Sequence, residues 1–189
     1  MTRDKSLRSG ERQVASSLDG IEAWHRWRYN ETLGYIAGKT VLDMCCGTGY
    51  GSFIMSEKAK SVLGIDDSEE AIKWANNHFK TPNNSFMCDD FLKAEVDGNI
   101  IDVIVTFEAI EHIRDTQAVF NKFKIINPDT IILSTPHTSC PLGGNKFHHR
   151  HFGLDELVDR FNGIGYKVKR AELRYYNTSL DVFIVVEKR

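Results

Sequence analysis

The chain has 189 residues with a formal net charge of −2; 41% of its residues are hydrophobic and 26% are charged. This length allows a sizeable core, and the composition excludes a collagen-like or disordered chain. Without a global positive charge, nucleic acid and membrane surfaces are not favoured as partners, although a local basic patch for nucleic acid stays open. No apolar run reaches the roughly 18 residues of a transmembrane helix, and the first residues lack an apolar signal core, so a cytoplasmic location is expected.

Residues 1–20 form a polar N-terminal segment, and one domain is expected over residues 21–189. Apolar and aromatic residues recur at helical spacing over Ile21–Ile36, which predicts a single helix. Beyond it, short apolar runs alternate with helical patterns, as in parallel strands that helices cover on both faces. The predicted strands are Val41–Met44, Ser61–Ile65, Ser85–Cys88, Ile100–Thr106 and Thr130–Ser134. The predicted helices between them are Tyr50–Lys58, Ser68–Phe79 and Thr116–Ile126.

The last third of the chain has a different pattern. A predicted helix at Leu154–Phe161 is followed by two strand patterns, Tyr166–Tyr175 and Asp181–Glu187. Only about five residues separate these strands, which is too short for a parallel crossover, so they are expected to pair as an antiparallel hairpin. The predicted fold class is therefore α/β: a Rossmann-like, doubly wound, mostly parallel seven-stranded sheet with a C-terminal antiparallel hairpin, in a single domain.

A glycine-rich turn, Asp43–Gly51, joins the first predicted strand to the following helix. Glycine lets the backbone turn tightly and lets a ligand approach closely, and this turn lies at the ligand-binding edge of doubly wound sheets. Its spacing is Gly-x-Gly-x-Gly, whereas dinucleotide loops have Gly-x-Gly-x-x-Gly. Asp43 would repel a pyrophosphate but suits a ligand with an ammonium and a sulfonium. These features disfavour a nicotinamide oxidoreductase.

Acidic residues follow the next two predicted strands. Asp66, with Asp67 beside it, stands about twenty residues beyond the loop, where a carboxylate can accept both ribose hydroxyl protons. Asp89 and Asp90 follow the third strand, where a carboxylate can accept a hydrogen bond from the exocyclic amine of adenine. Each acid alone could be an ordinary turn residue. Three such strand ends in succession indicate an adenosyl ligand.

On these motifs the chain resembles class I S-adenosylmethionine-dependent methyltransferases. The resemblance rests on Val41–Gly51, Gly64–Ser68, Cys88–Phe91, Ile101–Ile113 and Leu133–Leu157. It is greatest to bacterial methyltransferases of the type 11/12 kind, which carry Gly-Glu-Arg (here Gly10–Arg12) and a His-Arg-x-Arg-Tyr helix (here His25–Tyr29). The resemblance implies an enzyme that uses S-adenosylmethionine. The expected cofactor-binding residues are Asp43, Cys45, Gly47, Thr48, Gly49, Asp66, Asp67, Asp89, Asp90 and Phe107.

Residues able to act on the acceptor follow the fourth predicted strand. Glu108, Glu111 and His112 would share one face if this segment were helical. In one interpretation they serve as catalytic residues: His112 or His148, with Glu111, removes a proton from an acceptor hydroxyl. Purely structural roles in holding the loop are also open.

In the other interpretation, Glu108, Glu111, His112 and His148 bind one divalent metal ion, which would hold two vicinal acceptor oxygens. This set resembles metal-assisted methyltransferases that act on ribose ends of small RNAs and on quinone-precursor phenols. The last ligand is ambiguous, because His149 and His151 stand close to His148 in the chain.

An oxygen acceptor is expected, in a small molecule or as a sugar or ribose hydroxyl, because a histidine and two glutamates suit a hydroxyl that must lose a proton. The Asn/Asp-Pro-Pro-Tyr segment of nitrogen methylation and the Pro-Cys of cytosine methylation are absent after the fourth strand. The alternative function is a non-catalytic module that senses S-adenosylmethionine or scaffolds a partner. A homodimer in which a second subunit completes the site is a further open possibility.

Overall fold

The computed structural model describes residues 6–7, 11–98, 100–176 and 179–189. The chain divides into two compact units, residues 1–95 and 96–189. Gly10, the first residue of the Gly-Glu-Arg motif, lies outside the described residues, whereas Glu11 and Arg12 lie within them.

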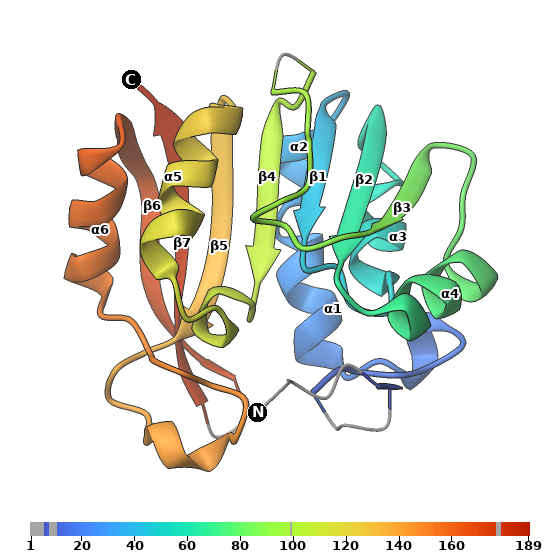
Figure 1. The fold of residues 1–189 in the computed structure, drawn as a ribbon, viewed down its shortest axis with the longest axis horizontal. Coiled ribbons are helices and arrows are strands. Elements are labelled where there is room, and N and C mark those ends of the chain that lie inside the picture. The colour runs from blue at the N-terminus through green and yellow to red at the C-terminus, as the bar shows by residue number, and fades with distance from the viewer. Residues whose placement is uncertain (1–5, 8–10, 99, 177–178) are drawn as a thin grey trace. The chain divides into compact units, whose positions relative to one another are not determined.

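Three parallel strands make the sheet of the first unit: β1 (Thr40–Met44), β2 (Ser61–Asp66) and β3 (Asn84–Cys88). Their order is β3-β2-β1, and the register places Met44 beside Ile65 and Asp66 beside Cys88. The three strands therefore end at one edge (Figure 1). Asp43, Asp66 and Asp89 are brought to this edge because each stands at or directly after a strand end.

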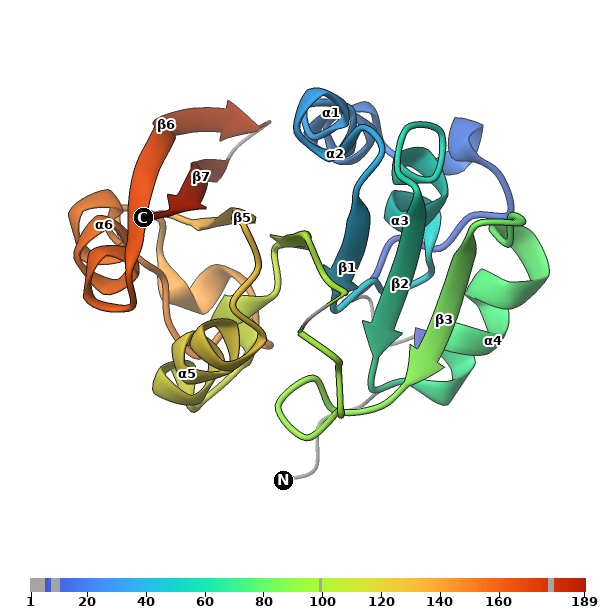
Figure 2. The ribbon, with the colours of Figure 1, turned by 90° about the horizontal axis from the view of Figure 1, so that it is seen from above.

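The helices of this unit are η2 (Leu18–Gly20), α1 (Ala23–Asn30), α2 (Leu33–Ile36), α3 (Tyr50–Met55) and α4 (Glu69–His78). Helix α1 packs on α3, and Figure 2 shows both on the same side of β1 and β2. Helix α4 begins where its sequence predicts, because the Ser68 hydroxyl accepts a hydrogen bond from the Ala71 N–H at 3.3 Å. The carboxylates of Glu69 and Glu70 in its first turn favour the positive helix end.

The single helix expected over Ile21–Ile36 is wrong, because the structure breaks it into α1 and α2. The Thr32 hydroxyl donates to the Tyr29 carbonyl at 2.7 Å, and the Thr32 N–H donates to the same oxygen at 3.0 Å. Such a side-chain bond competes with the regular helix ladder, and Gly34 further lowers the helix propensity. The aromatic periodicity continued across this break and concealed it.

The second unit holds β4 (Val103–Phe107), β5 (Thr130–Pro136), β6 (Tyr166–Tyr176) and β7 (Ser179–Lys188). Strand β5 pairs with β4 in parallel and with β7 antiparallel, and β7 pairs antiparallel with β6. The helices are η3 (Ile110–His112), α5 (Thr116–Ile126), η4 (Leu142–Gly144) and α6 (Leu154–Gly163), of which α6 packs on β6. Every residue of β4 is buried, as expected for a strand covered on both faces.

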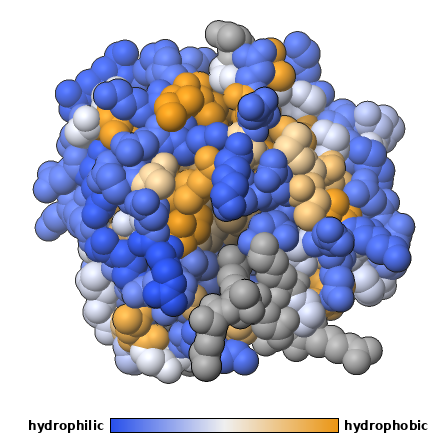
Figure 3. Space-filling model, viewed as in Figure 1, coloured by the Kyte–Doolittle hydropathy of each residue, from blue (hydrophilic) through white to orange (hydrophobic). Residues whose placement is uncertain are grey.

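The expected α/β fold class is confirmed. Parallel strands alternate with helices, and the last two of the seven strands form the antiparallel hairpin that their short connection predicted. On the face drawn in Figure 3, hydrophilic side chains are interspersed with separate apolar groups. Across the described part of the chain, no helix is both long and apolar enough to cross a bilayer.

Candidate active site

The glycine turn after β1 has a backbone that side chains would obstruct. Gly47 and Gly49 both have a positive φ, and Gly49 is the N-cap of α3. A Cβ atom on Gly49 would lie 2.5 Å from the Ala75 Cβ and 2.9 Å from the Phe86 ring. Only glycine fits at this position, because the turn lies close to both α4 and β3.

Asp43 lies fully buried beneath this turn. Its Oδ2 accepts a hydrogen bond from the Ser52 hydroxyl at 2.6 Å, and its Oδ1 has no hydrogen-bond partner among the described residues. Burial raises the pKa of Asp43 to about 7, and the neighbouring Asp66 carboxylate adds to the rise. A buried carboxyl group in this state gains its charge readily when a cation comes near it.

Asp66 collects hydrogen bonds from three directions. Its Oδ2 accepts from the Gly47 N–H at 3.0 Å, and its Oδ1 accepts from the Ser68 N–H at 3.1 Å and from Arg12 Nη2 at 2.9 Å. The carboxylate is thus tied to the glycine turn and to the start of α4. Its third partner, Arg12, comes from the N-terminal segment.

Residues 11–13 form an N-terminal strap across the glycine turn. Arg12 also pairs with Glu11 at 3.0 Å and approaches Asp67 at 3.6 Å, and the Thr48 hydroxyl donates to the Gln13 carbonyl at 2.8 Å. Sequence reasoning assigned Arg12 no role beyond its motif, because its partner Asp66 is 54 residues away in the chain. Three expected cofactor-binding residues, Thr48, Asp66 and Asp67, contact the strap.

The acids after β3 take part in local turns. The Asp89 N–H donates to the Asp66 carbonyl at 3.1 Å, which joins the two strand ends. The Asp89 carboxylate accepts from the Asp90 N–H at 2.7 Å, and that of Asp90 accepts from the Leu92 N–H at 3.0 Å. The turn interpretation of these acids therefore has direct support, while Asp89 still lies at the expected edge. Cys45, at the start of the glycine turn, is half-buried and has a positive φ.

In the second unit, Phe107 ends β4 and is buried beside Phe183, with ring centroids 6.0 Å apart. Glu108 follows with a positive φ, and its Oε1 accepts from the Ser134 hydroxyl at 2.7 Å. The helical segment considered for Glu108, Glu111 and His112 does not form, because only Ile110–His112 adopts a 3-10 turn. Glu108 precedes that turn and is held by the end of β5.

Glu111 is fully buried. Its Oε2 accepts from the Thr135 hydroxyl at 2.9 Å, whereas its Oε1 is buried without a hydrogen-bond partner in the described structure. Burial raises the pKa of Glu111 well above its ordinary value, and the charges of Glu108 and Asp181 raise it further. The Glu111 Oε1 atom lies 3.9 Å from His112 Nε2.

His148 joins this pair from the loop after η4. The loop is fixed to η3 by the His149 N–H, which donates to the Glu111 carbonyl at 2.8 Å. The rings of His148 and His112 meet edge to face, with centroids 4.7 Å apart. One donor atom each of Glu111, His112 and His148 lie within 4.8 Å of one another, and Glu108 is not part of this group. We call these three residues the Glu-His-His cluster.

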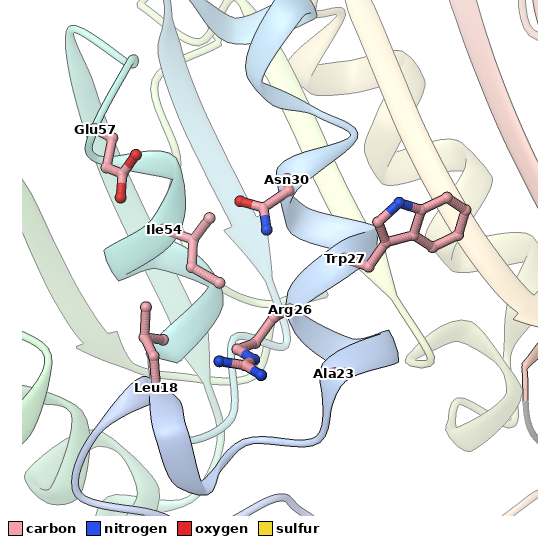
Figure 4. Close-up of a pocket in the computed structure, with 7 residues that line it drawn as sticks. All are labelled: Leu18, Ala23, Arg26, Trp27, Asn30, Ile54 and Glu57. Carbon is pink, nitrogen blue, oxygen red and sulfur yellow. The ribbon is translucent and has the colours of Figure 1, made fainter.

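A separate hollow of about 370 Å³ lies between α1 and the region of α3. Figure 4 shows Asn30 of α1 directed toward the space that Ile54 and Glu57 also line. None of the expected site residues contributes to its lining, which consists of Leu18, Ala23, Arg26, Trp27, Asn30, Ile54 and Glu57.

Comparison with known proteins decides the family. Residues 37–158, more than half of the chain, match the family described as "Methyltransferase domain". The chain belongs to this methyltransferase family. The match includes the glycine turn, the acids at the ends of β2 and β3, and the Glu-His-His cluster.

Relatives with curated names agree with this membership. A probable S-adenosylmethionine-dependent methyltransferase of Mycolicibacterium smegmatis is 29% identical over 154 residues, which cover 77% of this chain and 58% of the relative. A ubiquinone biosynthesis O-methyltransferase of Coxiella burnetii is 33% identical over 106 residues, which cover 54% of this chain and 45% of that protein. The chain thus spans between two fifths and three fifths of the length of these relatives.

Solved structures show the same fold. A putative S-adenosylmethionine-dependent methyltransferase from Listeria monocytogenes has a TM-score of 0.72 at 18% identity, over 89% of this chain and all of that one. A magnesium protoporphyrin IX methyltransferase from Synechocystis, solved with S-adenosylhomocysteine, has a TM-score of 0.74 at 18% identity, over 95% of this chain and 90% of that one. The predicted Rossmann-like methyltransferase fold is confirmed.

Proposed function

We propose that this methyltransferase chain binds S-adenosylmethionine at the glycine turn and transfers its methyl group to a hydroxyl oxygen of a small molecule or sugar. When bound, S-adenosylmethionine supplies an activated methyl group on a positive sulfur. Three of the expected donor-binding residues, Asp43, Asp66 and Asp89, lie at or next to strand ends on one sheet edge of the first unit. Buried Asp43 suits a cationic ligand, because a nearby positive charge favours its ionised form.

The Glu-His-His cluster is the observation that carries the choice of an oxygen acceptor. A hydroxyl group is a weak nucleophile until a base removes its proton, and imidazole is the usual base near neutral pH. We propose that His148 or His112 accepts this proton. Glu111, close to His112 and buried, stabilises the imidazolium that results, as a carboxylate does beside a catalytic histidine.

Apart from removal of the hydroxyl proton, methyl transfer has two main requirements. The acceptor oxygen must be aligned with the methyl carbon, and water must be kept away. The oxygen's electron pair then forms the new bond to carbon as the bond between sulfur and carbon breaks, and the proton remains on the histidine. This chemistry explains why three side chains suffice.

Metal binding is the second candidate for the same cluster. One carboxylate and two imidazoles are a donor set that manganese, iron and zinc accept, and Glu111 Oε1 is a buried oxygen without a hydrogen-bond partner in the described structure. When bound, such an ion would supply a Lewis acid for the acceptor oxygen. The raised pKa of Glu111 is compatible with both candidates, because either an imidazolium or a metal ion beside Glu111 would favour its ionised form.

The test is transfer of a labelled methyl group from S-adenosylmethionine to a panel of diphenols, sugars and amines, with and without a chelator. We expect turnover on a hydroxyl compound that the chelator leaves unchanged. His148→Asn and His112→Asn should lower it by about 10²- to 10⁴-fold. His149→Asn, at an exposed histidine next to His148, is the matched control and should retain activity.

Each other outcome has a meaning. Loss of turnover with chelator and recovery with one divalent ion would support the metal candidate. Transfer to amines alone would contradict an oxygen acceptor. Binding of S-adenosylmethionine without transfer to any compound would favour a sensor or scaffold.

A further inference from the structure

The Glu-His-His cluster continues into a second layer of hydrogen bonds. His148 Nδ1 lies 2.8 Å from His151 Nε2, and the rings of these two residues meet at 5.1 Å between centroids. His151 Nδ1 in turn lies 3.1 Å from the carbonyl oxygen of Cys140. His151 was one of three histidines considered as the last ligand of the expected metal site. In the structure it contacts His148 and is not a member of the Glu-His-His cluster.

The Cys140 carbonyl oxygen ends the chain of hydrogen bonds that runs from His148 through His151. It fixes the direction of both hydrogen bonds when the two histidines are neutral. A carbonyl only accepts, so His151 Nδ1 must carry a proton. In neutral His151 the lone pair then lies on Nε2, which makes it an acceptor. The proton between the two rings therefore belongs to His148 Nδ1, and the lone pair of neutral His148 lies on its Nε2.

The carbonyl itself is well anchored. The Leu180 N–H donates to Cys140 Sγ at 3.3 Å, and the Cys140 N–H donates to the His137 carbonyl at 2.9 Å. The backbone of Phe152 pairs with that of His137 through a β-bridge. Strand β7 and the end of β5 thus hold both Cys140 and the segment that carries His151.

We propose that His151 is a positioning residue that holds His148 as the tautomer with its proton on Nδ1, leaving Nε2 to accept a proton. The catalytic meaning of this tautomer rests on the proposed function, in which His148 is a base for a hydroxyl acceptor. The tautomer itself does not depend on that function. The partner of a functional imidazole commonly sets its tautomer in this way.

Two substitutions separate the contacts of His151. His151→Gln keeps a side-chain oxygen near the place of Nε2 and can still accept from His148. His151→Phe keeps the planar bulk and removes the acceptor. Nitrogen-15 NMR of the full chain near pH 8, where ordinary imidazoles are neutral, reports the tautomer of each histidine directly. Amide spectra and thermal melts check that both variants fold.

We expect the proton of His148 on Nδ1 in the unaltered chain and in His151→Gln, and a mixture of tautomers in His151→Phe. With a hydroxyl acceptor found by the screen above, kcat should fall by about 10- to 100-fold in His151→Phe, with partial recovery in His151→Gln and little change in KM for S-adenosylmethionine. A His148 proton on Nε2 in the unaltered chain, or a tautomer that does not respond to His151→Phe, would overturn the proposal. If the tautomers are as expected but no methyl transfer occurs, the proposed function fails and the positioning role of His151 stands.

Discussion

Asp43 combines complete burial with a carboxyl group whose pKa burial has raised to about 7. Ser52 supplies one strong hydrogen bond, and this bond partly offsets the cost of removing the carboxylate from water. Such a residue destabilises the fold whenever it is charged. Its presence under the glycine turn is understandable if a cationic ligand recovers that cost on binding.

The first prediction concerns the pH dependence of stability. Between about pH 4 and pH 7 the folded chain holds a proton on Asp43 that an unfolded chain has released, so the contribution of Asp43 to the free energy of unfolding falls as pH rises through this window. Asp43→Asn removes this fall, which is on the order of a few kcal/mol. Urea unfolding at pH 5 and pH 7.5 measures it as the difference between the variant and the unaltered chain.

That difference is needed because other groups titrate in the same range. The pKa of His25 is lowered to about 4 by burial and by Arg28, which gives the opposite slope, and the raised pKa of Glu111 gives the same slope as Asp43. Both remain in the variant and cancel. Asp19→Asn, at an exposed acid, is the control. Equal pH slopes in Asp43→Asn and the unaltered chain would contradict the account of Asp43.

The second prediction separates backbone strain from close approach at glycine. Gly38 and Gly49 both have a positive φ, but a Cβ on Gly38 would meet no atom within 4 Å, whereas one on Gly49 would collide with Ala75 and Phe86. Gly38→Ala should lower the free energy of unfolding by about 1 kcal/mol. Gly49→Ala should lower it by roughly 1–3 kcal/mol more, through overpacking. Equal losses in urea unfolding would show that the turn at Gly49 is not tightly packed.

At the scale of elements, the N-terminal strap bears directly on ligand binding. Arg12 occupies Oδ1 of Asp66, an oxygen that the ribose hydroxyls of an adenosyl ligand are expected to need. The strap also accepts the Thr48 hydroxyl bond through Gln13. Ligand and Arg12 should therefore compete for the same carboxylate.

The third prediction follows from this competition. Arg12→Gln should tighten the binding of S-adenosylhomocysteine by about 3- to 10-fold, since a tenfold change corresponds to about 1.4 kcal/mol. Arg26→Gln, which removes the same charge from α1, should leave the affinity unchanged. Calorimetric titration of the variants measures both effects. Weaker binding in Arg12→Gln would mean that Arg12 contacts the ligand and does not compete with it.

The elements that the sequence predicted well are those whose signals are local. Helix α5 has the bounds that its pattern indicated, and α4 begins at its Ser68 cap. The break between α1 and α2 depends on a single hydroxyl bond of Thr32, which hydrophobic periodicity does not reveal. The positive φ of Glu108 likewise depends on contacts with β5 that a local pattern cannot contain.

In the candidate site too, features with local sequence signals could be predicted, and features that depend on distant contacts could not. The parallel register brings the strand-end acids to one edge, and this could be inferred because parallel strands end together. The position of His148 beside Glu111 arises from a loop closed by backbone bonds, so the sequence left three histidines open. No residue pattern predicted the contacts of Arg12, Thr135 or His151. Arg12 and Thr135 bind partners that are distant in the chain, and the role proposed for His151 depends on a tautomer.

At the scale of the whole molecule, Asp43, Asp66 and Asp89 lie in the first unit and the Glu-His-His cluster lies in the second. Family membership supports the donor assignment across residues 37–158, which span parts of both units. The chain covers only 58% of the length of the Mycolicibacterium smegmatis relative. The name of that relative therefore does not identify the acceptor of this chain, which must be found by experiment. The Glu-His-His cluster directs that search to hydroxyl compounds.

Calorimetric titration of the chain with S-adenosylhomocysteine, with NADH as the comparison ligand, tests whether the glycine turn binds an adenosyl ligand. We expect one S-adenosylhomocysteine bound per chain, no binding of NADH, and a loss of affinity in Asp66→Ala of at least tenfold while the variant remains folded. If S-adenosylhomocysteine produces no binding heat at any temperature, or if Asp66→Ala binds it as tightly as the unaltered chain, the adenosyl site does not lie at the glycine turn.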